Sequence, residues 1–136
     1  MDTAKRLKRL RSALKKNNLE AIFISQADNR RYLSGFTGSD GFLVITASAQ
    51  IVATDFRYVE QVKRQSPDFE LRRISGETAV WFPIAVDGLG IKELAFEADD
   101  LAFSRYEKLR KSAKSLGIRL MSSSGLVEEL RMVKEP

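Results

Sequence analysis

The chain has 136 residues, of which 43% are hydrophobic and 30% charged, with a net charge of +5, and this composition suits one soluble domain with a single core. It contains neither cysteine nor histidine, which excludes disulfides, thiolate chemistry and Ser-His-Asp catalysis and leaves no conventional zinc ligands. No stretch is long and apolar enough for a signal peptide or a membrane span, so we expect no membrane partner, and cytoplasmic is the default location.

The first predicted element is a basic amphipathic helix over residues 3–17. Its apolar residues recur at helical spacing, at Ala4, Leu7, Leu10 and Leu14. Residues 1–18 hold seven of the 23 basic side chains and one of the 18 acidic ones, a balance of +6, whereas the other 118 residues hold 16 and 17 and carry −1. One basic helix on a near-neutral body indicates a solvated face, and it lacks the aromatic residues that stack on bases or anchor in bilayers. We therefore expect no nucleic-acid partner.

A buried strand and a short helix follow. Residues 21–24 read Ala-Ile-Phe-Ile, a run that predicts a strand buried on both faces in the middle of a sheet. Asp28 is the expected N-cap of the short helix, and Gly35 is expected to end it.

A glycine-rich loop comes next, over residues 36–41. Its glycines precede a strand, whereas phosphate-binding loops follow a strand and open a helix, so the phosphate interpretation fails. Two interpretations stay open. The loop either needs glycine for a tight backbone path, or it presents Ser39 and Asp40 to something outside the domain.

The middle of the chain predicts a hairpin and a helix. Two strands over residues 42–46 and 51–54 are separated by a short polar turn, which is typical of a β-hairpin. Asp55 is then expected to cap a helix with inward-facing apolar residues from Phe56 onward. That helix should stop before Pro67, because the residue before proline avoids the helical region.

A strand and an apolar helix are expected beyond that proline. Residues 69–74 predict a strand with one wet side near the edge of the sheet. Residues 78–89 predict a helix, in which Pro83 is tolerated if it falls within the first turn. Trp81 and Phe82 fit core packing better than they fit an exposed interface anchor.

The last third of the chain predicts two strands and two helices. A short strand is expected over residues 93–97, and residues 104–107 form a capping box that opens a helix with Leu116 facing inward. A strand over residues 118–121 and a helix over residues 126–133 complete the pattern. Strands alternating with helices, plus one hairpin, predict a three-layer α/β/α domain over residues 1–136 whose sheet is mixed and largely parallel.

Carboxylates are the remaining candidates for metal chemistry. A two-metal site would need several of them to converge at strand ends. Each has a simpler interpretation, because Asp55 reads as a helix cap, Glu97 as a strand terminus and Asp99-Asp100 as an exposed turn. We therefore expect no metal ligand in this segment.

Several motifs resemble one known family. Residues 29–41, NRRYLSGFTGSDG, closely resemble the N-x-R-Y-L-(T/S)-G-F-T-G-S-(D/N)-G motif of creatinase/prolidase-type N-terminal domains in bacterial Xaa-Pro peptidases, the aminopeptidase P and prolidase family. Residues 54–61 look like its T-D-x-R-Y-x-x-Q, and residues 126–134 are similar to its L-V-(E/D)-x-L-R-x-x-K helix. Ala95 departs from the pattern, since glycine usually precedes Phe-Glu. The resemblance spans nearly the whole chain.

The resemblance implies both a fold and a role. The fold would be the creatinase N-terminal domain with its ribonuclease H-like motif. A C-terminal pita-bread catalytic domain, absent from this chain, would bind two divalent metal ions (Mn, Co or Zn). The parent would be an Xaa-Pro dipeptidase or aminopeptidase acting on proline-containing peptides. This segment would hold no cofactor and no catalytic residue, would contact its own catalytic domain, and would mediate homodimer formation and restrict access to the active site.

The resemblance also implies site residues. The loop over residues 36–41 is similar to one that reaches the neighbouring subunit's active site in family dimers. There Asp40 would pair with a substrate's free amino terminus, with Ser39 and Phe36 beside it. Arg57 and Tyr58 match a family motif next to this region, although an arginine in that position also serves to tie the loop in place.

Other functions remain open. Related domains that have lost their metal ligands act as non-catalytic modules that bind peptides or histones. Creatine amidinohydrolysis is a further activity within the family, although the loop looks more like that of the peptidase branch. A nucleic-acid-binding α/β domain using the basic helix is a third class, and it predicts affinity that falls steeply with salt.

Overall fold

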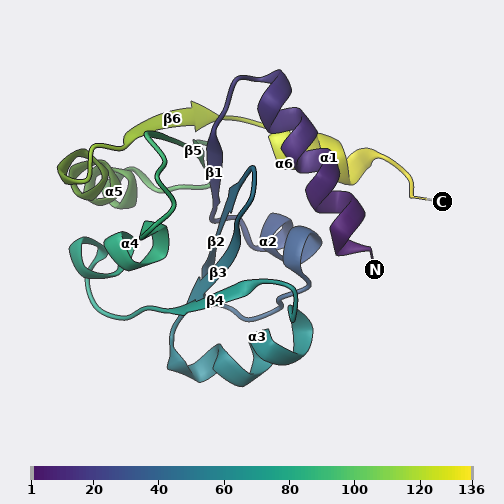
Figure 1. Cartoon of the computed structure of the whole chain (residues 1–136), viewed down its shortest axis with the longest axis horizontal. Helices are drawn as coiled ribbons and strands as arrows, with labels where there is room; N and C mark the ends of the chain where they lie inside the picture. The colour runs from purple at the N-terminus through teal and green to yellow at the C-terminus, as the bar shows by residue number, and fades with distance from the viewer. Residues whose placement is uncertain (1, 136) are drawn as a thin grey trace.

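The computed structural model describes residues 2–135, which form three layers around one sheet (Figure 1). In chain order the elements are α1 (Thr3–Lys16), β1 (Ala21–Ile24), α2 (Ala27–Ser34), β2 (Phe42–Thr46), β3 (Gln50–Thr54), the 3₁₀ turn η1 (Phe56–Tyr58), α3 (Val59–Gln65), β4 (Glu70–Arg73), α4 (Thr78–Val86), β5 (Glu93–Glu97), α5 (Phe103–Ser115), β6 (Arg119–Ser123) and α6 (Leu126–Met132). Helices α1, α2, α3 and α6 cover one face of the sheet, and α4 and α5 cover the other. The predicted three-layer α/β fold is confirmed.

The sheet has six strands in the order β4-β3-β2-β1-β5-β6. Strand β2 pairs antiparallel with both β1 and β3, and the other three pairings are parallel. The predicted hairpin and the mixed, largely parallel sheet are therefore confirmed. Because β1, β3, β4, β5 and β6 all run the same way, their carboxyl ends meet at one edge, together with the loop that enters β2. We call this edge the carboxyl edge.

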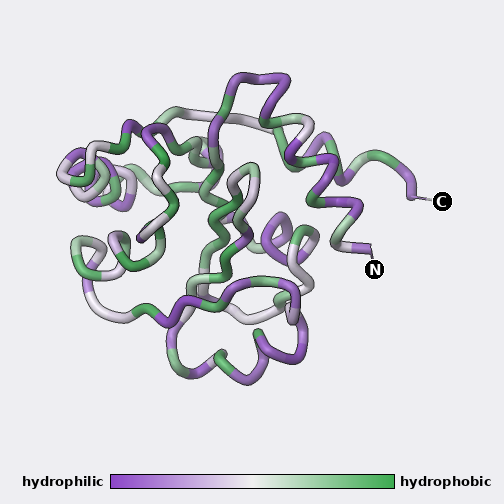
Figure 2. Tube along the Cα trace, in the orientation of Figure 1, coloured by the Kyte–Doolittle hydropathy of each residue, from purple (hydrophilic) through white to green (hydrophobic). Residues whose placement is uncertain are grey.

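The strand β1 is buried on both faces, as its sequence predicts. Its Phe23 faces the α4 and α5 layer, where it stacks on Phe42 with ring centroids 4.8 Å apart, and Phe42 stacks on Trp81 at 4.9 Å. Trp81 and Phe82 are 6% and 0% exposed, so their predicted core role is confirmed. Figure 2 shows the hydrophobic residues running along the central strands between the two helical layers.

Two predicted helix starts were wrong. The N-cap of α2 is Gln26, whose side chain accepts a hydrogen bond from the Asn29 amide at 2.7 Å, and Asp28 lies inside the first turn. The N-cap of α5 is Ala102, which makes no side-chain cap bond, so Ser104 is helical and the predicted capping box does not form. In both cases the helix begins before the residue with the stronger local preference.

Three apolar residues also differ from expectation. Phe56 is 66% exposed because the chain leaves β3 through a 3₁₀ turn, which changes the helical phase before α3 begins. Leu116 is 44% exposed because it follows the last residue of α5 as its C-cap. Pro83 lies at the sixth residue of α4, beyond the first turn, where it removes the backbone bond to the carbonyl of Ala79.

The basic face of α1 is only partly a solvated face. Its lysines are exposed, as predicted, but its three arginines are partly buried and donate to backbone carbonyls elsewhere in the domain. Arg6 Nη1 reaches the carbonyl of Tyr32 at 2.9 Å, Arg9 Nη2 that of Leu130 at 3.0 Å, and Arg11 Nε that of Thr46 at 2.8 Å. These arginines therefore fasten α1 to α2, to α6 and to the β2–β3 turn. Within residues 2–135 no helix is long and apolar enough to cross a bilayer.

Candidate functional site

The predicted site residues come together at the carboxyl edge. Ser39 and Asp40 lie in the loop that enters β2, and Arg57 and Tyr58 lie in the turn that leaves β3. Because β2 and β3 are neighbours in the sheet, these two segments lie side by side. Open α/β sheets bind ligands outside the carboxyl ends of their strands, so this edge is a candidate place for a site.

A buried arginine that the sequence analysis missed binds the loop over residues 36–41 from inside the domain. Arg30 is 4% exposed, and its guanidinium donates to the carbonyls of Ser25 at 3.1 Å, Gly38 at 3.0 Å and Gly41 at 3.0 Å. Its Nε has no partner within residues 2–135, and burial lowers its pKa. The sequence indicated this burial only through helical spacing, because Arg30 lies three residues before Leu33 and so on the same, buried face of α2.

A close approach of side chain to backbone fixes the start of the loop. Phe36 is 1% exposed and packs directly under Gly38, where an added Cβ would lie only 2.2 Å from the phenylalanine Cζ. Gly41 has a φ of +149°, and a Cβ there would meet the carbonyl oxygen of Ala53 at 3.1 Å. Two of the loop's glycines are therefore required by contact and by backbone conformation. Phe36 lies inside the domain and supports the loop.

The exposed part of the loop is braced by neighbouring polar groups. Thr54 Oγ1 donates to the Asp40 carbonyl at 2.7 Å, and the hydroxyl groups of Ser39 and Tyr58 lie 2.5 Å apart. The Tyr58 ring meets Phe36 edge-on with centroids 5.8 Å apart. The loop thus has fixed contacts on both sides, while its Ser39 and Asp40 side chains point away from the core and are exposed.

Arg57 is already engaged within the domain. Its Nε and Nη2 donate to the two carboxylate oxygens of Asp55 at 2.9 and 2.8 Å. These bonds lower the pKa of Asp55, and the carboxylate raises the pKa of Arg57. Asp55 also caps η1 by accepting from the Arg57 amide, so its predicted capping role is confirmed. Arg57 Nη2 also forms an ion pair with Asp40 Oδ2 at 3.7 Å, which is longer than a hydrogen bond, and the Asp40 side chain is 61% exposed. Asp40 therefore keeps free acceptor capacity for a cationic group.

A pocket of about 390 Å³ opens next to Asp40. It lies between the β3 exit, the end of β4 and the start of α5, and its lining includes Trp81 and Phe42. Charged side chains of both signs line it: Asp40 and Asp55 on one hand, Arg57 and Arg105 on the other. Because Arg57 and Asp55 bind each other, Asp40 and Arg105 are the charges that remain for the ammonium and the carboxylate group of a ligand.

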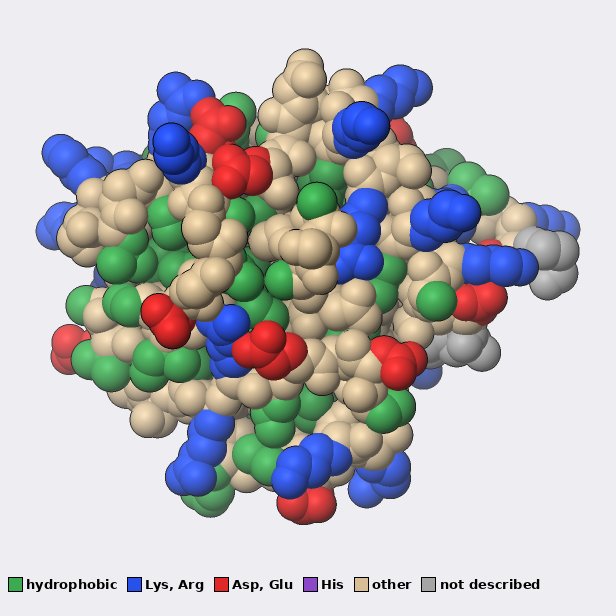
Figure 3. All heavy atoms as spheres, in the orientation of Figure 1, with side chains coloured by type: hydrophobic (Ala, Val, Ile, Leu, Met, Phe, Trp, Pro, Cys, Tyr) green, Lys and Arg blue, Asp and Glu red, His purple; other side chains and the backbone are tan. Residues whose placement is uncertain are grey.

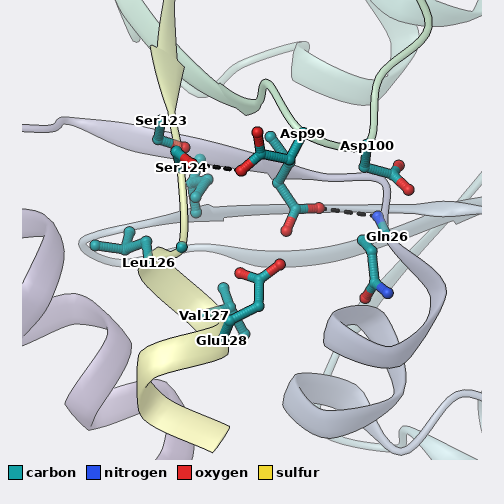
Figure 4. Close-up of a pocket in the computed structure, with 11 residues that line it drawn as sticks. Gln26, Asp99, Asp100, Ser123, Ser124, Leu126, Val127 and Glu128 are labelled. Atoms are coloured by element: carbon teal, nitrogen blue, oxygen red, sulfur yellow. Dashed lines mark hydrogen bonds between the residues drawn. The ribbon is translucent and has the colours of Figure 1, made fainter.

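A second pocket at the carboxyl edge, of about 260 Å³, is strongly acidic (Figure 4). It lies beyond the ends of β1, β5 and β6, with Asp99, Asp100 and Glu128 around it, and Asp99 accepts a hydrogen bond from Ser124. The predicted turn at Asp99-Asp100 is confirmed. This is the crevice between β1 and β5, where the chain connections diverge to opposite sides of the sheet and where doubly wound folds place ligands.

Glu97 lines that crevice, and its carboxylate is bound by donors from the protein itself. It is 8% exposed and accepts from the amides of Ser25 and Gln26, both at 2.8 Å, and from Asn29 Nδ2 at 2.5 Å. Burial raises its pKa. Asn29 Oδ1 in turn accepts from Arg131 Nη1 at 3.0 Å. Glu97 thus ends β5 in a structural role, joining β5, α2 and α6.

The residues of this segment do not fit a metal centre. Across residues 2–135 no three acidic side chains are placed to share a metal ion, and the Glu97 oxygens are already used by protein donors. Metal ions that the family resemblance implies would therefore need ligands from outside this chain.

The fold and the site define a small α/β domain that presents a braced polar loop at the carboxyl edge of a mixed sheet. Residues 6–133 match the family model of the creatinase/prolidase N-terminal domain, and the chain belongs to that family.

Relatives with this fold are peptidases. YqhT of Bacillus subtilis, described as an uncharacterized peptidase, is 33% identical over 129 residues, which cover 95% of this chain and 36% of YqhT. The Xaa-Pro dipeptidase from Bacillus anthracis has a TM-score of 0.90 at 33% identity, over 98% of this chain and 37% of that one. The N-terminal domain of the cytoplasmic peptidase PepQ from Mycobacterium tuberculosis has a TM-score of 0.83 at 33% identity, over 93% of this chain and 98% of that one. The chain thus spans little more than a third of the first two relatives, and nearly all of a domain solved alone.

Proposed function

We propose that this chain is the N-terminal accessory domain of a metal-dependent Xaa-Pro dipeptidase or aminopeptidase, in which it mediates oligomerisation and narrows access to the active site. The parent enzyme would hydrolyse peptide bonds that adjoin proline. Membership of the creatinase/prolidase N-terminal domain family supports the class. The observation that carries the role is the loop over residues 36–41, which is held rigidly by Arg30 but leaves the Asp40 carboxylate exposed.

In this role Asp40 would act on a substrate bound in the neighbouring subunit. Arg57 gives its hydrogen bonds to Asp55 and forms only a longer, 3.7 Å ion pair with Asp40, so the exposed Asp40 carboxylate keeps acceptor capacity that suits the ammonium of a free amino terminus. Ser39 and Tyr58 would orient the loop and offer hydroxyl groups at its rim. Phe36 would act through the loop, because its side chain is buried.

Two divalent metal ions (Mn, Co or Zn) would belong to the catalytic domain that follows this segment in the parent protein. Within residues 2–135 no three acidic side chains are grouped to hold a metal ion, so the contribution of this segment would be shape and charge at the entrance to the active site. The PepQ relative is described as cytoplasmic, and we propose the same location here.

The test uses the full-length protein that carries this chain, loaded with Mn²⁺ and assayed on Xaa-Pro dipeptides with a free amino terminus. Asp40→Asn should raise KM about tenfold with kcat within about twofold, because one charge-assisted contact to the substrate is lost. Asp68→Asn, which changes an exposed aspartate outside the loop, is the matched control and should leave KM unchanged.

The outcomes separate the two parts of the proposal. No hydrolysis of any proline peptide by the wild-type protein would overturn the enzyme assignment and favour a non-catalytic peptide-binding module. Hydrolysis with the same KM in Asp40→Asn as in wild type would keep the enzyme but remove Asp40 from the substrate site.

A further inference from the structure

A groove lies between α1 and the turn that joins β2 to β3, at the sheet edge opposite the candidate site. Its volume is about 580 Å³. One side is a stripe of α1 residues at helical spacing, and the remaining lining comes from the segment before β1 and from the turn: Ala4, Lys8, Arg11, Ser12, Leu14, Lys15, Leu19, Glu20 and Ala47. The stripe from Ala4 to Lys15 covers eleven residues of helical rise, or roughly 16 Å.

The groove is positively charged. Lys8 and Lys15 are exposed and form no ion pair within residues 2–135, and Arg11 donates to the carbonyls of Thr46 and Ala49 without a carboxylate partner. Figure 3 shows blue Lys and Arg side chains over the α1 side of the molecule, at the upper right. The one acidic residue in the lining, Glu20, already accepts a hydrogen bond from the Lys92 amide. The local charge therefore favours an anionic occupant.

Between the basic residues, apolar and small side chains line the groove. The half-buried Leu19 forms part of this lining, above the core residue Leu14, which is 3% exposed. Small side chains at Ala4, Ser12 and Ala47 leave space beside the long basic ones, whose aliphatic stems are also apolar. Arg11 spans from α1 to the turn and fixes the two walls relative to each other. An occupant would gain apolar contact along the groove and ion pairs at Lys8 and Lys15.

Two classes of anionic partner fit these features poorly. A bilayer needs apolar side chains to insert, but the apolar residues Leu7 and Leu10 of α1 are 3% and 0% exposed and face the core. A single-stranded nucleic acid stacks its bases on aromatic side chains, but no aromatic residue lines the groove. A duplex bound through its phosphates would gain nothing from the apolar part of the lining. An acidic peptide with alternating apolar side chains satisfies both the charge and the lining.

We propose that this groove docks an acidic peptide segment of a partner protein, with its apolar side chains against Leu19 and Ala47 and its carboxylates at Lys8 and Lys15. The site is separate from the loop at the carboxyl edge and does not depend on the function proposed for that loop.

The test titrates the 136-residue chain against a fluorescein-labelled probe peptide of about five residues, the number that spans roughly 16 Å when extended, in which glutamate alternates with leucine. Fluorescence anisotropy follows the binding. Saturable binding is expected. The double variant Lys8→Glu/Lys15→Glu should weaken it at least tenfold. The matched control Lys5→Glu/Lys16→Glu changes the charge equally on the same helix but outside the groove, and should weaken binding less than threefold. Circular dichroism checks that both variants fold.

Further probes separate charge from apolar contact and from other partners. A probe with lysine in place of glutamate, and one with serine in place of leucine, should each lose saturable binding. Equal weakening by both double variants would overturn the proposal in favour of diffuse electrostatics. Two other results would also overturn it: groove-dependent binding of duplex DNA or anionic vesicles at physiological salt, and self-association of the chain that Lys8→Glu/Lys15→Glu abolishes.

Discussion

Replacing Arg30 tests whether the loop over residues 36–41 is held from inside the domain. Arg30→Met keeps a long side chain but removes all the donors to the carbonyls of Ser25, Gly38 and Gly41. A buried acceptor left without a partner costs about 1–3 kcal/mol, so the two buried carbonyls, of Gly38 and Gly41, would together cost several kcal/mol, and the half-buried carbonyl of Ser25 would add less. Removing the buried charge offsets part of this loss of stability, because burial disfavours the charged form of Arg30 and lowers its pKa.

We therefore expect Arg30→Met to lower the free energy of unfolding by about 3 kcal/mol, a large share of the 5–15 kcal/mol typical of a domain. Urea unfolding measures it, and amide hydrogen exchange should show faster opening of the loop than of the central strands. Arg31→Met is the control, since it makes the same change on the next, exposed residue and should stay within about 0.5 kcal/mol.

A loss below about 1 kcal/mol, or one equal to that of Arg31→Met, would refute the reasoning. It would mean that water reaches the three carbonyls as soon as the guanidinium is gone, and that the loop keeps its shape through Phe36 and the hairpin alone.

Two further changes probe the same edge of the sheet. Gly38→Ala should destabilise the chain by about 1–3 kcal/mol in urea unfolding, because its Cβ would lie 2.2 Å from Phe36 Cζ. Gly88→Ala is the control: Gly88 has a φ of +73° and no atom within 4 Å of the added Cβ, so only backbone strain of roughly 1 kcal/mol is expected. Burial raises the pKa of Glu97 in the folded state, so wild type should gain stability relative to Glu97→Gln as the pH falls from 7 toward the unfolded-state value of about 4.3. Urea unfolding of both proteins at several pH values checks this, and a stability difference that shrinks on acidification would contradict it.

The elements predicted correctly from the sequence are those whose burial follows from the pattern of apolar residues within a few neighbouring positions. Four consecutive apolar residues over 21–24 are sufficient to predict a central strand, and two such runs around a polar turn predict the hairpin. The position of Ser39 and Asp40 next to Tyr58 followed from motifs rather than from periodicity, and the structure shows why: two neighbouring strands bring the segments together.

The features that sequence reasoning missed depend on partners distant in the chain. Arginine is usually exposed, so the burial of Arg30 had only the helical phase of α2 to indicate it. The carboxylate of Glu97 accepts from Ser25 and Gln26, more than seventy residues away, and no local pattern records that bond. The arginines of α1 likewise reach distant carbonyls with a planar fork that lysine lacks, so equal charges behave differently on one helix.

One turn of α2 joins the two ends of this arrangement. The side-chain oxygen of Asn29 accepts a hydrogen bond from Arg131 of α6, and its side-chain nitrogen donates to Glu97. The adjacent Arg30 donates to the loop carbonyls of Gly38 and Gly41. Consecutive residues of one short helix therefore contact both α6 and the loop. If a catalytic domain follows α6, as we propose, its placement relative to Asp40 is constrained through this turn, and a loosening of either bond would displace the loop from the entrance it is proposed to narrow.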